Sequence, residues 1–167
     1  MSSENKSQSL ALLLVRIWLG VRAVVSGIEK FAGKVSSDSE VSIDGSVNAY
    51  GLTATETTKT YGFSFYSGIP EPLKAKFASE PLLPEFLLGF FNAILGPGLI
   101  LAGIATILGV FPRISLFVLG IIFTLLTVGL ILIKQDAGVA WLGIHILLVA
   151  FVLFNADKDK CILLGKK

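Results

Sequence analysis

Residues 114–133 read ISLFVLGIIFTLLTVGLILI, a run of consecutive residues without a single charged side chain. A helix of about 20 residues, rising about 1.5 Å per residue, crosses the roughly 30 Å of hydrocarbon in a bilayer. Because backbone polar groups in lipid must be paired within the protein, a run of this kind is expected to be helical. The stretch therefore predicts a membrane span.

Three further stretches have the same character. They are residues 10–31, 85–110 and 139–154, the last extended by Ala137 and Gly138. Of the 167 residues, 53% are hydrophobic and 16% charged, whereas a soluble domain has about 25% charged residues. The sequence predicts an all-α membrane protein, a four-transmembrane-helix bundle that forms a single domain over residues 1–167.

The distribution of positive charge predicts the orientation of these spans. Lys and Arg gather on the cytoplasmic side of membrane proteins. If the termini are cytoplasmic, that side carries the N-terminal tail, the connection between the second and third spans, and the C-terminal tail, with Lys6, Arg113, Lys158, Lys160, Lys166 and Lys167. We therefore expect a multi-pass protein of the cell inner (cytoplasmic) membrane with both termini in the cytoplasm.

Residues 34–83, between the first two spans, are polar and rich in Ser and Thr, and form a predicted extracytoplasmic loop subdomain. Asp44-Gly45, flanked by Val41, Ile43 and Val47, predicts a short β-hairpin. Residues 61–66 alternate in a way that fits a strand, but their aromatic rings fit the membrane interface equally well. Pro72, Leu73 and Phe77 predict a short interfacial helix.

A fifty-residue connection in a small protein usually has a function. Residues 36–83 are therefore a candidate docking surface for a larger membrane protein complex. The alternative is a flexible linker, against which the density of aromatic residues argues.

Polar residues inside the spans are the candidate binding site. Arg22 lies about 13 Å from the outer end of the first span, and Ser26 and Glu29 share its helix face. The other three spans place one polar group each at a similar depth, namely Asn92, Thr127 and His145. Since buried arginines in membranes usually face protein or water, Arg22 is expected to turn inward.

Two interpretations of this polar layer remain open. In the first, Arg22 donates hydrogen bonds to Asn92, Thr127 and His145, and the network only stabilises the bundle. In the second, the layer is a pocket for a quinone or a lipid head group. Arg22 and His145 would then bind carbonyl oxygens, and His145 or Glu29 would exchange the proton.

The composition excludes several other functions. One cysteine, Cys161, and one histidine cannot form an internal disulfide, a bis-histidine haem site or an unaided zinc site. No nucleotide-binding or metalloprotease motif occurs. The net charge of +2 is small and scattered, which gives no support for nucleic-acid binding. We expect no intrinsic cofactor, no metal and no self-contained catalytic site.

The first span also carries a family resemblance. Arg16, Gly20, Gly27 and Lys30 resemble the opening helix of the DoxX/DoxD-like membrane proteins, with an Arg, a Gly four residues later and G-x-x-K near the outer end. The resemblance implies a four-helix bundle with cytoplasmic termini, in a family associated with the membrane part of thiosulfate:quinone oxidoreductase. Arg22 and the longer, more aromatic outer loop depart from the family pattern, so the family activity does not transfer directly.

Two functional hypotheses follow from these features. The chain is either an accessory subunit of a membrane redox or energy-converting complex that contacts a quinone, or a purely structural subunit that docks a partner through its outer loop. A transporter is the least supported alternative, because no inverted repeat is recognisable and residues 96–98 (GPG) have no counterpart in the other half.

Overall fold

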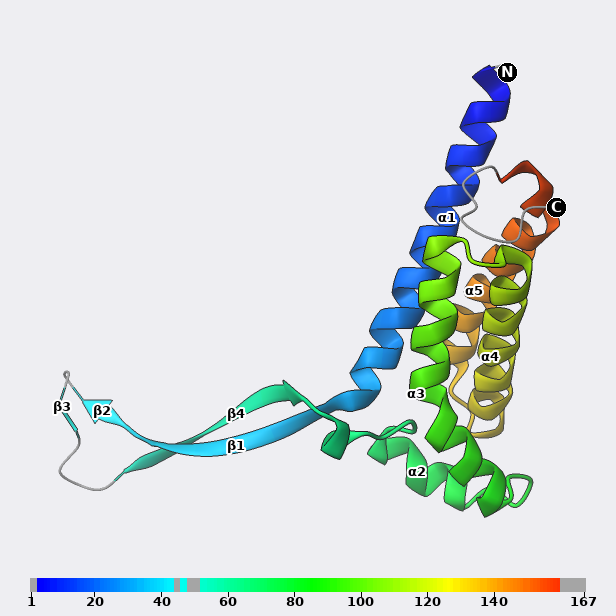
Figure 1. The fold of residues 1–167 in the computed structure, drawn as a ribbon. Coiled ribbons are helices and arrows are strands. Elements are labelled where there is room, and N and C mark those ends of the chain that lie inside the picture. The colour runs from blue at the N-terminus through cyan, green and yellow to red at the C-terminus, as the bar shows by residue number, and fades with distance from the viewer. Residues whose placement is uncertain (1–2, 44–45, 48–51, 160–167) are drawn as a thin grey trace. The chain divides into compact units, whose positions relative to one another are not determined.

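The computed structural model describes residues 3–43, 46–47 and 52–159. Within these residues the protein is mostly helical, and four helices are long and apolar enough to cross a membrane. They are α1 (Ser3–Ile28), α3 (Glu85–Leu108), α4 (Pro112–Leu132) and α5 (Asp136–Phe154), shown in Figure 1. They confirm the four predicted helical stretches. Three short 3-10 helices are η1 (Glu29–Phe31), η2 (Phe63–Phe65) and η3 (Ala156–Lys158).

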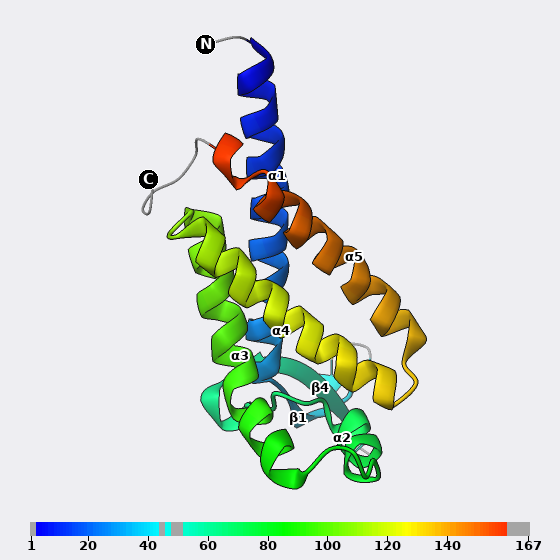
Figure 2. The same ribbon diagram turned by 90° about the vertical axis from the view of Figure 1, so that its right-hand side faces the viewer.

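Prolines and glycines set the ends of the long helices. Pro84 precedes α3 and Pro112 opens α4, where the missing proline N–H removes no helical hydrogen bond. Gly109 ends α3 with φ of 68°, a left-handed conformation that glycine adopts without strain. α3 continues through Pro97, and its ribbon bends in the N-terminal half (Figure 2).

The chain divides into two compact units, residues 1–30 with 67–167, and residues 31–66. The predicted loop subdomain is thus shared between them. Residues 67–83 join the helical unit because Phe77, on α2 (Glu71–Ala78), packs with Ile69 and Ile133 in a small apolar cluster. Helix α2 confirms the predicted short helix around Leu73 and Phe77.

In the helical unit, α1 and α3 pack closely along two pairs of glycines. A Cβ atom on Gly20 would lie 2.8 Å from the carbonyl oxygen of Gly103, and one on Gly27 would lie 2.9 Å from that of Gly96. In each helix the two glycines are two turns apart and so lie on one face. Small residues let helix backbones approach closely where no hydrophobic force drives association.

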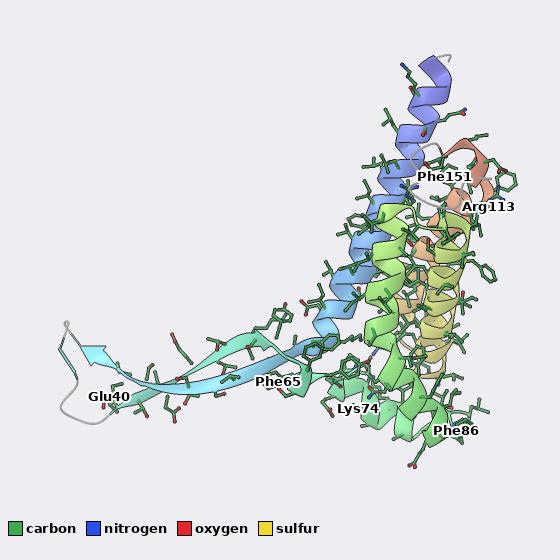
Figure 3. The ribbon with its side chains drawn as sticks, in the orientation of Figure 1. Glu40, Phe65, Lys74, Phe86, Arg113 and Phe151 are labelled. Carbon is green, nitrogen blue, oxygen red and sulfur yellow. The ribbon has the colours of Figure 1, made fainter. Side chains whose placement is uncertain are left out.

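The apolar core of this unit takes residues from all four long helices. Its buried members are Leu19, Ala23, Leu95, Leu99, Ala102, Leu116, Leu119, Phe123, Val149 and Val152. Many large apolar side chains outside the core are exposed, among them Phe86 and Phe151, which lie toward opposite ends of the helices (Figure 3). An apolar exterior of this extent is typical of a protein surrounded by lipid.

Residues 31–66 form an antiparallel ribbon. Strand β1 (Ala32–Glu40) pairs with β4 (Thr53–Tyr61), with Ala32 opposite Tyr61 and Glu40 opposite Thr53. Between them, β2 (Ser42–Ile43) pairs with β3 (Ser46–Val47), which confirms the predicted short hairpin. Its turn residues, Asp44 and Gly45, lie outside the described residues.

Aromatic rings close the base of the ribbon. The centroid of the Phe31 ring lies 4.8 Å from the ring centroid of Tyr66 and 5.6 Å from that of Phe63, and the rings of Phe31 and Phe63 meet edge to face. Of the two interpretations of residues 61–66, the strand extends only to Tyr61. The chain then turns through η2, so that the rings gather around Phe31 instead of alternating along a strand.

We expect Gly103→Ala to lower the stability of the helical unit by about 1–3 kcal/mol, because the new methyl group meets backbone atoms of α1 that cannot move aside. The measurement is thermal or denaturant unfolding of the purified protein in detergent. Gly143→Ala is the matched control, since a Cβ there meets nothing within 4 Å. Equal stabilities of the two variants would contradict the close packing of α1 on α3.

Candidate functional site

The structure places Arg22 on the exposed surface of α1. In the described part of the chain its guanidinium has no hydrogen bond or ion pair, so it does not donate to Asn92, Thr127 or His145. The prediction that Arg22 turns inward was therefore wrong. Inserting an arginine at the centre of a membrane helix costs about 2.5–3.5 kcal/mol or more, and the described residues of the helical unit do not offset that cost.

The arginine that does turn inward is Arg16. It is 1% exposed and forms an ion pair with Asp159, which is 4% exposed and follows η3. From the sequence, Arg16 was singled out only as part of the motif in the first span, and its pairing with Asp159 was not predicted. Arg16 shares one buried helix face with Leu12, Leu19 and Ala23, but the exposed faces of α1 are equally apolar, so no signal in the sequence marked this face as the inner one.

A second ion pair lies at the same end of the helices. Arg113, in the first turn of α4, pairs with Asp157 in η3, and both side chains are exposed. Figure 3 shows Arg113 at the end where α4 begins and α5 finishes. The two pairs attach the segment after α5 to α1 and to α4. A buried pair mainly fixes one arrangement of the chain, because desolvation offsets much of its attraction, and an exposed pair contributes little.

His145 is the polar residue of the predicted layer that lies in the core. It is 7% exposed, its Nδ1 lies 2.7 Å from the carbonyl oxygen of Trp141, and its ring meets Phe123 edge to face. Its Nε2 is buried and has no hydrogen-bond partner among the described residues. An unsatisfied buried nitrogen costs stability, and such a group in a native fold calls for an explanation.

The remaining predicted site residues have local roles. The side-chain oxygen of Asn92 accepts a hydrogen bond of 2.8 Å from the backbone N–H of Ile69 and so holds the segment before α2 against α3. Thr127 donates to the carbonyl oxygen of Phe123, one turn back in α4. Ser26 is half-buried and Glu29 is exposed. The structure thus satisfies Asn92 and Thr127 without Arg22.

An apolar groove lies between α4 and α5. It measures about 280 Å³, and its walls include Phe117, Ile121, Leu125, Ile146 and Leu153. Thr124 adds a hydroxyl that already donates to the carbonyl oxygen of Gly120. Such a groove can accommodate an acyl chain, and the Thr124 hydroxyl, whose proton is already engaged, can only accept a hydrogen bond there. Across the described ranges, no cluster of His, Cys, Asp and Glu has the makings of a metal site.

Comparison of the chain with models of protein families, with curated proteins and with solved structures finds no match. The resemblance of the first span to DoxX/DoxD-like proteins therefore stays a prediction.

We expect Arg16→Leu to destabilise the helical unit by about 3–5 kcal/mol, because it leaves the Asp159 carboxylate buried without its partner. The double variant Arg16→Leu with Asp159→Leu should recover much of that loss. Unfolding of both variants in detergent measures the difference.

Arg113→Leu is the matched control, since it removes an arginine from an exposed pair and should cause a much smaller loss. If the double variant were as unstable as the sum of the two single variants, the two residues would not interact as described.

Proposed function

We propose that this chain is a multi-pass accessory subunit of the inner membrane, with both termini in the cytoplasm, that holds a partner protein through its extracytoplasmic ribbon. The resemblance to DoxX/DoxD-like proteins suggests that the partner belongs to a membrane redox or energy-converting complex. The observation that carries the proposal is the ribbon of β1 and β4, whose strands are exposed along nearly their whole length.

A lone two-stranded ribbon is at best marginally stable in water. Neither face of this one is apolar enough to form half of a core. One face carries a cross-strand bond of 2.7 Å from the Thr55 hydroxyl to Asp38, and Ser36 lies opposite Thr57 with hydroxyl oxygens 3.4 Å apart. On the other face, Val35 is the large apolar side chain, and it is exposed. Binding through apolar side chains is therefore not what this ribbon offers.

What the ribbon does offer is its edges. At the two ends of the ribbon, Gly62 N–H donates to the carbonyl of Phe31 and Val41 N–H donates to that of Leu52. In an antiparallel ladder every second pair of opposite residues is hydrogen-bonded, and the pair of Ser36 and Thr57 is one of the pairs that is not. In that alternation, Ser36 on β1 and Thr57 on β4 turn their backbone N–H groups away from the partner strand. Such outward groups can pair with a strand of another protein, which extends the sheet.

The variant Ser36→Pro with Thr57→Pro tests this proposal. Each proline removes an outward N–H and leaves the hydrogen bonds between β1 and β4 in place. In native membranes extracted with mild detergent, we expect the tagged variant to migrate at its own mass on native gels, while the parent chain migrates in a larger complex.

Ser36→Ala with Thr57→Ala is the matched control, because alanine keeps the N–H groups while removing both hydroxyls. It should remain in the complex. A proline variant that still migrates in the complex would reject docking through the ribbon edges.

A second candidate function is supported by the unpartnered Nε2 of His145. We infer that a quinone or lipid head group binds at His145 and not at Arg22. A neutral imidazole can donate from one nitrogen to a carbonyl oxygen while the other accepts, although the contact of Nδ1 with the Trp141 carbonyl makes Nδ1 the donor and leaves Nε2 as an acceptor. The ligand group that fits Nε2 is then a hydroxyl, as in a quinol.

Trp141 provides the measurement, since it lies one turn from His145. In a Trp18→Phe background, Trp141 is the remaining tryptophan, and a short-chain quinol or quinone should quench its fluorescence. We expect His145→Leu to weaken saturable quenching at least tenfold, with the quinol affected more than the quinone. Quenching that is identical in both backgrounds would reject His145 as a ligand-binding residue.

A further inference from the structure

We propose that Arg22, with the exposed face of α1 around it, is an intramembrane docking surface for a transmembrane helix of a partner protein that carries a carboxylate at the same depth. This inference goes beyond the proposed function, because it uses a different surface and does not depend on the ribbon.

Helix α1 has an inward face that contacts the rest of the helical unit and an outward face that carries Arg22. Gly20 and Gly27 face α3, and Arg16 faces the core, where Asp159 neutralises it. Arg22 lies outside both contacts. Around it, Trp18 is 56% exposed and Val25 is 46% exposed, one turn to either side. The face therefore combines a charge with large apolar side chains, and the described residues of the helical unit provide no counter-ion for it.

Arg22 also lies close to the middle of its membrane span. The candidate span Lys6–Phe31 has its midpoint between Trp18 and Leu19, which places the Cα atom of Arg22 about 5 Å from the centre of the span at helical rise. Side chains on a helix point back toward its N-terminus. The guanidinium of Arg22 therefore leans toward the middle of the bilayer and away from the nearer interface, where it would have met lipid head groups. Snorkelling to that interface works against the direction of the side chain.

The counter-ion of Arg22 has to come from a different protein. The chain has twelve acidic residues, and those within the candidate spans lie near span ends: Glu29, Glu85 and Asp136. A second copy in the same orientation would thus bring no carboxylate to the depth of Arg22, and would bring a second arginine instead. A carboxylate on a helix of a different protein satisfies the charge, and the planar guanidinium suits a carboxylate with two parallel hydrogen bonds.

A model helix tests this inference without knowledge of the natural partner. The probe is a fluorescent polyleucine transmembrane peptide with one central Glu, reconstituted with the full chain in phosphatidylcholine vesicles. The acceptor dye is attached to Cys161, the single cysteine, and energy transfer reports association. We expect the Glu peptide to associate at least tenfold more tightly than an all-leucine peptide, and Arg22→Leu to abolish that difference.

Two further comparisons make the result specific. Arg22→Glu should associate with a peptide that carries a central Lys, as a charge reversal requires. Arg113→Leu, which removes an exposed arginine at the helix end, should leave association with the Glu peptide unchanged. The Ser36→Pro with Thr57→Pro variant should also bind the peptide normally, so failure of the ribbon proposal and failure of this one are distinguishable.

Three outcomes would overturn the proposal. The first is equal association of the Glu and all-leucine peptides with the parent chain, a comparison that needs no variant to fold. The second is energy transfer between two copies of the chain that Arg22→Leu removes, which would assign the face to a second copy. The third is loss of peptide association when phosphatidylglycerol is added, which would assign Arg22 to lipid head groups.

Discussion

The structure depends on one constraint, that a charged group within a membrane span needs a partner from protein. The helical unit meets that constraint where Arg16 pairs with Asp159 and both side chains are almost fully buried. Among the described residues of this unit, none meets it for Arg22, which is exposed on the same helix. Arg16 thus stabilises the helical unit itself, whereas Arg22 presents its charge to a neighbouring protein. That division explains why α1 has one face rich in glycine and another that carries Arg22 beside large apolar side chains.

Depth was predictable from the sequence, but direction around the helix was not. Arg16 and Arg22 are six residues apart, a rotation of about 240°, so only one of them can face the core. In a soluble protein, polar residues on the outer face would have marked the inner one. Here lipid-facing positions such as Leu14 and Val25 are as apolar as the buried Leu19 and Ala23, so the pattern carries no information on which arginine is inside. The four long helices were predictable because length and hydrophobicity suffice for them, and α2 was predictable from Pro72 and the four-residue spacing of Leu73 and Phe77.

In the ribbon, the local turn was predictable from the sequence and the longer strand pairing was not. The hairpin of β2 and β3 was predictable from Asp44-Gly45, a local turn signal. The longer pairing of β1 with β4 was not, because it joins residues 13 to 29 positions apart and both faces of the ribbon are polar, so no apolar period marks the strands. In the predicted polar layer, Asn92 and Thr127 hydrogen-bond to backbone groups close by, and His145 keeps a buried Nε2 that has no hydrogen-bond partner among the described residues.

The ion pair between Arg16 and Asp159 also has a consequence for biosynthesis. The two residues are separated by 143 positions, and ribosomes add about 5–20 residues per second. Arg16 is therefore synthesised roughly 7–29 seconds before Asp159. During that interval the Arg16 guanidinium has to be solvated by other groups, either in the insertion machinery or by water at the cytoplasmic surface. The pair between α1 and the segment that follows η3 can form only after residue 159 has been synthesised, so the final packing of α1 depends on a residue that is made after all four long helices.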